Sequence, residues 1–431
     1  MGKCKEMNEF FSFSERIDKL SEIALSKAEG QFKKIEKVSE FNQQKVLRAF
    51  IDNRVSEAHL GTSTGYGYGD VGRDTLDRIV AEVFNTEDAV IRTSLVSGTH
   101  TLCVALFGIL RPKDVLLCVS GTPYDTLHST IGIDSDKSDG NGTLKDFGVI
   151  YKEIGLREDE SFNLEEIALR AAEKDVKMVY IQRSRGYDTR HSFSIDEIKE
   201  VCDIVHKVNK DAIVFVDNCY GEFVEEKEPT DVGADLIAGS LIKNMGGGVA
   251  LCGGYIAGRH SLVELCTYRM TTPGLGREVG ASLSQNRNLY LGLFHAPHVV
   301  GEALKTAVFA SALFEEMGFE TDPKFDDTRH DIVQLIKLKN AKNLCAFCRG
   351  IQKGSPVDSY VTPEPWDMPG YDSKVIMAAG TFTGGSSIEL SADAPLREPF
   401  AVWMQGGLNF ASGKTAVKFA AAEVENESEK S

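Results

Sequence analysis

The sequence predicts an α/β protein with a large, mainly parallel sheet, followed by a smaller α+β domain. Three observations carry this expectation. Short apolar runs alternate with helical patterns between about residues 90 and 260, which is typical of a parallel sheet covered on both faces. A long helical stretch follows, with further strand-like runs beyond it. The length of 431 residues also exceeds what one compact core usually holds, so two domains, or one large domain with additions, are expected.

Residues 1–60 are expected to form a helical arm. The segment "NQQKVLRAFIDNRV" places four apolar side chains on one stripe at helical spacing: Val46, Leu47, Phe50 and Ile51. The arm is polar enough to lie on another surface. A glycine-rich loop, "GTSTGYGYGDVGRDTL", comes next, and "DTLDRIVAEVF" predicts a helix after it.

The large domain is expected over residues 61–295, where strands and helices alternate. The predicted strands are "AVIR", "DVLLCV", "GVIYKEI", "VKMVYI", "AIVFVD", "ADLIAGSL" and "GGYIAG". The predicted helices between them include "SGTHTLCVALFGIL", "NLEEIALRAAEK" and "SIDEIKEVCDIVHKV". This order favours parallel strands joined by crossover helices.

The second domain is expected over residues 296–431. The run from "NRNLYLGLFHAP" to "FEEMG" predicts a long connecting helix that is interrupted at Pro297. Beyond it, the predicted strands are "DIVQLIKLK", "KVIMAAGTF", "SSIELS" and "AVWMQGGL". The acidic tail "AAAEVENESEKS" is expected to be frayed.

Composition excludes several classes of partner. The net charge of -16 disfavours nucleic acid and anionic membranes, which need clustered Lys and Arg. No apolar run reaches the ~20 residues of a membrane span, and the N-terminus lacks an apolar signal core. We therefore expect a cytoplasmic protein. The nine scattered cysteines indicate reduced thiols, and the CxxC of Cys345 and Cys348 is interpreted as a helical core pair, so no metal is expected.

The stretch Ser97, Gly98 and Thr99 is a candidate phosphate site. It precedes an apolar helix, and a helix N-terminus offers free N–H groups and a positive dipole end. Ser and Thr are also common caps of helices that bind nothing, so both interpretations stay open. The motif is not GxGxxG and no acidic residue follows on a suitable second strand, which argues against a dinucleotide site.

Asp217 and Lys243 are the candidate catalytic residues. Asp217 ends the apolar run "IVFVD", at the carboxyl end where open α/β sheets bind ligands. A helix cap or a salt bridge would explain this carboxylate equally well. Lys243, in "GSLIKNMGGG", follows another strand-like run and precedes three glycines that allow close backbone approach. Its amine is an exposed charge, a phosphate clamp or a covalent anchor for a cofactor.

Together these features suit pyridoxal 5'-phosphate. This cofactor needs a helix N-terminus for its phosphate, a lysine for a Schiff base, and an acid that keeps its ring nitrogen protonated so that the ring acts as an electron sink. The phosphate turn, Asp217 and Lys243 follow one another in that order. Tyr124, in "GTPYDTLHSTIG", is placed to stack on the ring.

The chain resembles pyridoxal-phosphate enzymes of the aspartate-aminotransferase fold type (fold type I). It is most similar to the cystathionine/methionine γ-lyase group and, within it, to the family labelled aluminum resistance proteins. The motifs that carry the resemblance cover roughly residues 60–400: "GYGYGDVGRDTL", "SGTHTL", "GTPYDTLHSTIG", "VDNCYGEF", "GSLIKNMGGG" and "SSIELSADAPLREP".

The resemblance implies a role for each motif. Lys243 forms the Schiff base, Asp217 pairs with the pyridine nitrogen and Tyr124 stacks on the ring. The residues implied to hold the phosphate are Ser97, Gly98, Thr99 and Ser240.

A Tyr and an Arg from a neighbouring subunit complete the phosphate site in the γ-lyase group, which implies a homodimer or homotetramer with shared sites. Tyr66 or Tyr68 matches that Tyr. The Tyr-x-Arg spacing is absent, and Arg73 lies further along the chain.

Four arginines complete the list of candidates. Arg183 and Arg185 follow a strand where the better-known lyases have a Pro/Asn-containing turn; either one is a candidate for the substrate carboxylate or the cofactor's phenolic oxygen, with a surface salt bridge as the alternative. Arg397, in "SADAPLREP", offers a bidentate carboxylate clamp. Arg277 lies in a Gly/Pro-rich loop that we place near a subunit boundary.

The expected function is that of a pyridoxal-phosphate-dependent carbon–sulfur lyase, similar to methionine γ-lyase and acting on a sulfur-containing amino acid. Lys243, once freed by the substrate amine, would remove the α-proton. The sequence does not choose between β and γ elimination. The alternatives are a transaminase or aldolase on the same fold, and a non-catalytic stress-response protein.

Overall fold

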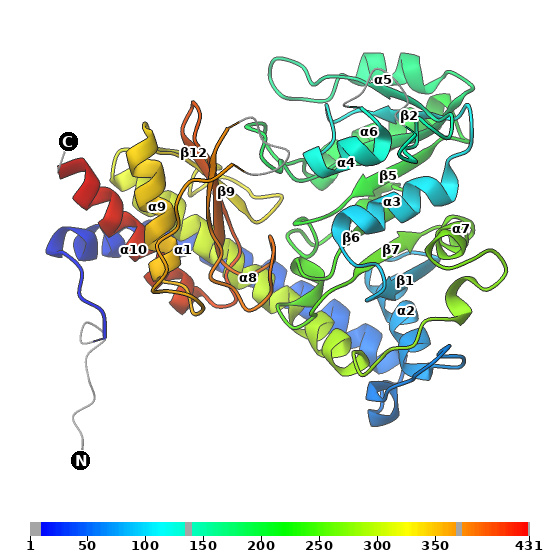
Figure 1. Cartoon of the computed structure of the whole chain (residues 1–431), viewed down its shortest axis with the longest axis horizontal. Helices are drawn as coiled ribbons and strands as arrows, with labels where there is room; N and C mark the ends of the chain where they lie inside the picture. The colour runs from blue at the N-terminus through cyan, green and yellow to red at the C-terminus, as the bar shows by residue number, and fades with distance from the viewer. Residues whose placement is uncertain (1–9, 134–139, 368–372, 430–431) are drawn as a thin grey trace. The chain divides into compact units, whose positions relative to one another are not determined.

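The computed structural model describes residues 10–133, 140–367 and 373–429 (Figure 1). The chain divides into two compact units. The large unit comprises Lys37–Gly301 and Arg329–Asp331, and the small unit comprises the residues before Lys37, Glu302–Thr328 and the residues from Ile332 onward. The division therefore falls inside two long helices, and each unit is described by itself below.

The large unit contains a seven-stranded sheet in the order β1-β7-β6-β5-β4-β2-β3. Strands β2 to β6 are parallel to one another, whereas β7 runs antiparallel to β1 and β6. The strands are β1 (Asp88–Arg92), β2 (Val115–Cys118), β3 (Ile150–Glu153), β4 (Val176–Gln182), β5 (Ile213–Asp217), β6 (Leu236–Ser240) and β7 (Gly254–Gly258). Each of the seven predicted runs forms one strand, and the predicted α/β fold class is confirmed.

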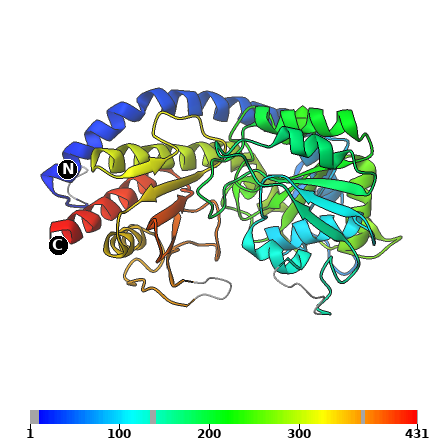
Figure 2. The ribbon, with the colours of Figure 1, turned by 90° about the horizontal axis from the view of Figure 1, so that it is seen from above.

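Helices cover both faces of this sheet. Figure 2 shows the cyan helix α3 on one side of the sheet and the green helix α6 on the other. The helices of the unit are α2 (Val71–Val83), α3 (Gly98–Ile109), α4 (Asp125–Ile131), α5 (Leu164–Ala171), α6 (Ile195–Val208) and α7 (His260–Met270). Helices α3 and α7 pack together against β7, and α5 packs beside α6.

Strand alternation decides which side chains reach the site. On the face covered by α3, the core contains two residues from each of β4, β5 and β6: Met178, Tyr180, Ile213, Phe215, Leu236 and Ala238. Side chains two residues apart share one face of a strand. The next residue on that face is therefore Gln182 on β4, Asp217 on β5 and Ser240 on β6. Three polar side chains thus meet at the carboxyl ends of adjacent parallel strands.

Two long helices, α1 (Glu15–Asp52) and α8 (Asn286–Glu316), each have residues in both units. A short 3-10 turn, η2 (Glu57–Leu60), follows α1. The prediction that α8 breaks at Pro297 is wrong, because the helix runs through this residue. Proline removes one backbone donor, and side chains of α1 bind carbonyl oxygens around it: Ser39 Oγ donates to Pro297 O and Gln43 Nε2 donates to Phe294 O, each at 2.9 Å.

The small unit has a five-stranded antiparallel sheet in the order β10-β11-β12-β9-β8. Its strands are β8 (Glu320–Asp322), β9 (Val333–Lys337), β10 (Val375–Ala378), β11 (Ser391–Pro395) and β12 (Ala401–Gln405). Helices α9 (Ala341–Lys353) and α10 (Phe410–Glu429) pack against each other. Cys345 and Cys348 lie on α9, and no group of His, Cys, Asp and Glu in the described residues could hold a metal.

Two predictions for the small unit are wrong. Most of "SSIELS" is a loop, because the carboxylate of Glu389 accepts the N–H groups of Phe382 (2.9 Å) and Thr383 (2.8 Å) and so turns the chain back before β11. The acidic tail is helical as far as Glu429, because Val417 and Val424 on α10 are buried in the core of the unit.

The described part of the chain contains no helix with both the length and the apolarity that a membrane crossing requires.

Candidate active site

The first part of the site is the N-terminus of α3, which faces the end of β6. Ser97 caps the helix, and its hydroxyl accepts the N–H of His100 at 3.1 Å. The first N–H groups of a helix have no partner within it. A Cβ on Gly98 would lie 3.3 Å from Cβ of Ser240, so the glycine lets the helix end approach this strand end closely. Thr99 lies beside Gly98, and its hydroxyl bonds to that of Thr126.

Ser240 is the residue whose side chain most clearly suits a bound anion. Its side chain is 1% exposed, and its hydroxyl oxygen has no hydrogen-bond partner among the described residues. Buried polar groups are rarely left unpaired because the cost is about 1–3 kcal/mol. An anion held by the N–H groups at the start of α3 would satisfy this hydroxyl, and the phosphate of pyridoxal phosphate is of that kind.

Asp217 lies at the end of β5 and is 7% exposed. Its carboxylate accepts the N–H of Cys219 at 3.1 Å, and the hydroxyl of Tyr180 lies 3.5 Å from its other oxygen. Burial raises the pKa of Asp217, while the N–H of Cys219 and the charge of Lys243 act in the opposite direction. A buried carboxyl group of this kind would be stabilised by a protonated ring nitrogen.

Lys243 follows β6 and begins the 3-10 turn η4 (Asn244–Gly246). Its Nζ atom lies 3.8 Å from the centroid of the Tyr220 ring. Burial disfavours the charge on this amine, but electrostatic interactions with neighbouring groups, the largest of them with Tyr220, outweigh burial and raise the pKa of Lys243. Asp217 and Tyr124 are among those groups, so the structure brings the predicted lysine, acid and aromatic residue into one electrostatic environment.

Tyr124 is anchored beside Asp217 through β4. The backbone N–H of Tyr124 donates to Gln182 Oε1 at 2.6 Å, and Gln182 is the register partner of Asp217 on β5. The ring of Tyr124 lies against the β4–α6 loop, where a Cβ on Gly186 would be 3.1 Å from it. The aromatic residue is therefore fixed relative to the acid that is predicted to bind the cofactor ring.

Tyr66 and Tyr68 project from the loop before α2. They are 73% and 61% exposed, and their ring centroids lie 5.6 Å apart. Arg73 is buried and donates to the carbonyl oxygens of Gly67 and Gly280, both at 2.9 Å. It thereby ties the loop of the two tyrosines to a second loop, so Arg73 supports this loop from inside.

The arginines predicted to bind substrate occupy different settings. Arg183 is fully buried, and its guanidinium donates to Asn218 Oδ1, to Gly221 O and to Glu225 Oε1 at 2.8 to 2.9 Å. These partners all lie in the segment after β5, so Arg183 holds that segment in place. Arg185 is also buried, and its backbone N–H donates to Ser192 Oγ at 3.0 Å.

Arg277 lies in a short 3-10 turn, η5 (Gly276–Glu278), and is half-buried, whereas Arg397 lies in a surface loop. Arg277 forms an ion pair with Asp88 at the start of β1, with 2.8 Å between Nη1 and Oδ1. Arg397 is exposed in the turn between β11 and β12 of the small unit.

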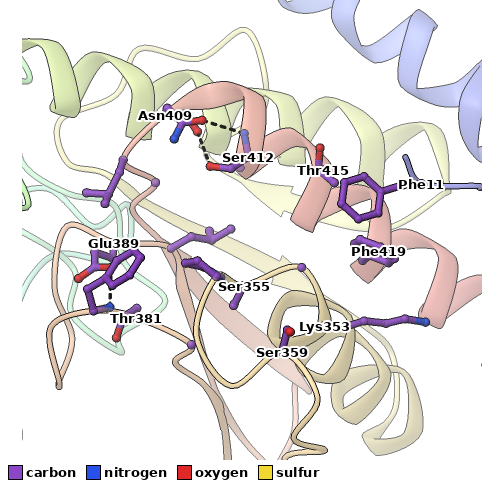
Figure 3. A pocket seen from close by; sticks show the side chains of 18 residues that line it. Phe11, Lys353, Ser355, Ser359, Thr381, Glu389, Asn409, Ser412, Thr415 and Phe419 are labelled. Carbon is purple, nitrogen blue, oxygen red and sulfur yellow. Dashed lines mark hydrogen bonds between the residues drawn. The ribbon is translucent and has the colours of Figure 1, made fainter. Parts of the chain in front are cut away.

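The small unit also contains a cavity of about 460 Å³ (Figure 3). Phe11 and Phe419 form one wall, with their ring centroids 5.5 Å apart in an edge-to-face arrangement. Both oxygens of Glu389, at the opposite end in Figure 3, are engaged by backbone N–H groups of the same unit. We assign no ligand to this cavity.

Sequence reasoning missed two residues of the site, Gln182 and Tyr220. Gln182 ends an apolar strand and aligns Tyr124 with Asp217. Tyr220 faces the lysine from within "VDNCYGEF", three residues after Asp217. The signal in the sequence was an aromatic residue only three positions after an acid at a strand end.

The large sheet, its helices and the smaller antiparallel sheet define a fold-type-I architecture, the fold of pyridoxal-phosphate-dependent lyases. A solved pyridoxal-5'-phosphate-dependent protein from Escherichia coli, YhfS, shares this fold with a TM-score of 0.61 at 13% identity, over 91% of this chain and 97% of that one. The chain itself belongs to the methionine gamma-lyase family, whose profile matches residues 17–425.

Two relatives are much more similar. The uncharacterized protein YnbB of Bacillus subtilis (strain 168) is 49% identical over 388 residues, which are 90% of this chain and 91% of that protein. The solved structure of a carbon-sulfur lyase involved in aluminum resistance, from Clostridium novyi NT, is 50% identical with a TM-score of 0.93 and covers 98% of this chain and 99% of its own. The resemblance to this family is thus confirmed.

Proposed function

We propose that this protein is a pyridoxal-phosphate-dependent carbon–sulfur lyase that acts on a sulfur-containing amino acid. The observation that carries the proposal is the partnerless, buried hydroxyl of Ser240, beside the start of α3 and three residues before Lys243. Membership of the methionine gamma-lyase family supports the reaction class.

The residues present fit the cofactor. Ser240, with the N–H groups of Gly98 and Thr99, would hold its phosphate. Asp217 would accept a hydrogen bond from its ring nitrogen, Tyr124 would cover one face of the ring, and Lys243 would bond its aldehyde carbon. When bound, the cofactor supplies an electron sink for the negative charge that remains on the substrate Cα after proton loss.

Lys243 has two tasks in this scheme. Its amine would anchor the cofactor before the substrate binds, and once released it would remove the substrate α-proton and hold it on Nζ. Only the neutral amine can accept that proton. A thiolate on Cβ would then leave with the electron pair of the broken C–S bond, whereas a thiolate on Cγ would leave only after a second proton is removed, from Cβ.

The substrate carboxylate requires a cation. Arg185 is a candidate because it is buried in the β4–α6 loop that also contacts Tyr124 through Gly186. Arg397 is the second candidate, on an exposed turn of the small unit. Arg183 is not proposed to bind the substrate carboxylate, because its guanidinium donates to Asn218, Gly221 and Glu225.

The proposal also includes a cytoplasmic homo-oligomer in which Tyr66 or Tyr68 reaches the site of a neighbouring subunit. The exposure of both rings, on a loop that Arg73 fixes from inside, supports this part.

The test is a panel of amino acids, including methionine, cystathionine and cysteine, assayed together for 2-oxo acid, ammonia and thiol. A lyase releases all three in equal amounts from one sulfur-containing substrate, and a Lys243→Ala chain releases none. Amino-group transfer without thiol would show a transaminase. Bound cofactor without turnover of any panel member would overturn the catalytic proposal.

A further inference from the structure

The aromatic ring of Tyr220 lies directly beside the amine of Lys243. The Nζ atom is 3.8 Å from the ring centroid, and Tyr220 is only 6% exposed. A cation over the face of an aromatic ring within about 6 Å is attracted by the ring quadrupole, and the attraction grows when water is excluded. The contact therefore favours the ammonium form of Lys243 in this position.

The backbone that places the Tyr220 ring is conformationally strained. Tyr220 has a φ of 70°, in the left-handed region that non-glycine residues seldom occupy. Such strain persists only where the surroundings impose it, and it is common at functional sites.

Contacts with Arg183 and Glu228 hold the backbone in this left-handed conformation. The guanidinium of Arg183 binds Gly221 O, immediately after Tyr220, at 2.9 Å. A Cβ on Gly221 would lie 2.6 Å from Cδ of Arg183, so there is no room for a larger residue. The carboxylate of Glu228 accepts the N–H of Phe223 and the side-chain amide of Asn218, both at 2.9 Å. The segment is thus fixed on both sides of Tyr220.

We propose that the ring face of Tyr220 is the resting place of the Lys243 ammonium before the cofactor binds and after the lysine has taken up the α-proton. Tyr220 is then a positioning residue that keeps the amine of Lys243 within the site at these two stages. This inference rests on the proposed function for its purpose, but the contact itself does not depend on any ligand.

The test measures the amine of Lys243 directly. The full chain, freed of cofactor, is treated with cyanate at a series of pH values, and carbamylation of each lysine is followed by peptide mass spectrometry. Cyanate reacts with the neutral amine, so the pH midpoint of the rate reports the protonation of Lys243. Lys305, which pairs with the carboxylates of Glu36 and Glu302, is the internal control.

Tyr220→Leu should lower the pH midpoint at Lys243 by about one unit and raise its rate at pH 7 about tenfold, because the ring's attraction for the ammonium is lost. Tyr220→Phe keeps the ring face and should stay within about twofold of the wild type. The rate at Lys305 should not change in either variant. An unchanged midpoint at Lys243 in a folded Tyr220→Leu chain would overturn the proposal.

A second series covers the case in which leucine disturbs the fold. Phenylalanine analogues with one, two and three ring fluorines at position 220 preserve the shape while they progressively weaken the negative ring face. The midpoint at Lys243 should fall in that order, and equal midpoints would contradict the proposal.

Cofactor uptake by the same chains separates this inference from the proposed function. Failure of pyridoxal phosphate to modify Lys243 in the wild type would refute the function and leave the cyanate result standing.

Discussion

Gln182 and Asp217 are register partners at the carboxyl ends of β4 and β5, and each fixes a different part of the candidate site. Gln182 accepts the backbone N–H of Tyr124, while Asp217 accepts that of Cys219. Two adjacent strand ends therefore align the residue predicted to cover the cofactor ring with the residue predicted to bind its nitrogen.

Ser240→Ala should weaken the affinity for pyridoxal phosphate by about 10- to 100-fold, because a hydrogen bond to a charged group is lost. The affinity for pyridoxal, which lacks the phosphate, should not change. Equilibrium titration of the cofactor-free chain with both compounds gives the two values. An equal loss for both compounds would show that Ser240 acts elsewhere than on the phosphate.

Asp217→Asn should retain bound cofactor but exchange the substrate α-hydrogen into deuterated water more slowly by orders of magnitude, because the ring nitrogen loses the acid that keeps it protonated. Proton NMR of the substrate, with enzyme matched for cofactor content, measures the exchange. Wild-type exchange in the variant would remove Asp217 from the mechanism.

Glu222 should make the protein less stable as the pH rises. Burial raises the pKa of Glu222 from 4.5 to about 8, and the hydroxyl of Tyr255 lies 2.8 Å from its carboxyl group. Between these two pH values the unfolded chain loses the proton while the folded chain keeps it, so the free energy of unfolding falls and then levels off above pH 8. Below pH 4.5 this contribution is complete.

Glu222→Gln removes this titration and should flatten the fall in Tm between pH 5 and pH 8, measured by thermal unfolding. Glu226→Gln, an exposed acid in the same segment, is the control and should follow the wild type. Parallel Tm curves for wild type and Glu222→Gln would contradict the raised pKa.

A shared active site predicts complementation between two inactive chains. A Tyr66→Ala/Tyr68→Ala chain mixed with a Lys243→Ala chain should regain part of the activity, because some sites in the hybrids combine an intact loop with an intact lysine. Native mass spectrometry confirms that hybrids form. Hybrids without activity would show that the loop serves its own chain.

Local patterns were sufficient to predict the large sheet and where several candidate site residues stand on its strands and helices. Apolar runs such as "IVFVD" are bounded by turn residues, so the strands and the position of Asp217 at a strand end follow from the sequence alone. The same applies to the start of α3, where Ser97 is the cap.

Contacts between residues far apart in the sequence determine the features that local patterns did not predict. The burial of Arg183 depends on acceptors 35 to 42 residues further along the chain, which no local pattern reveals. The continuity of α8 at Pro297 involves a hydrogen bond from a side chain of α1. The loop in "SSIELS" depends on the hydrogen bond that the carboxylate of Glu389 accepts from the N–H of Phe382. Tyr220 faces Lys243 only because its backbone is held at a positive φ.

The most direct test of the account is the site of cofactor attachment. The wild-type chain loaded with pyridoxal phosphate is reduced with borohydride, digested and mapped by mass spectrometry. The account predicts one stoichiometric adduct on Lys243, and no adduct or chromophore in Lys243→Ala. An adduct that maps to a different lysine, or a Lys243→Ala chain that keeps both chromophore and thiol release, would contradict it.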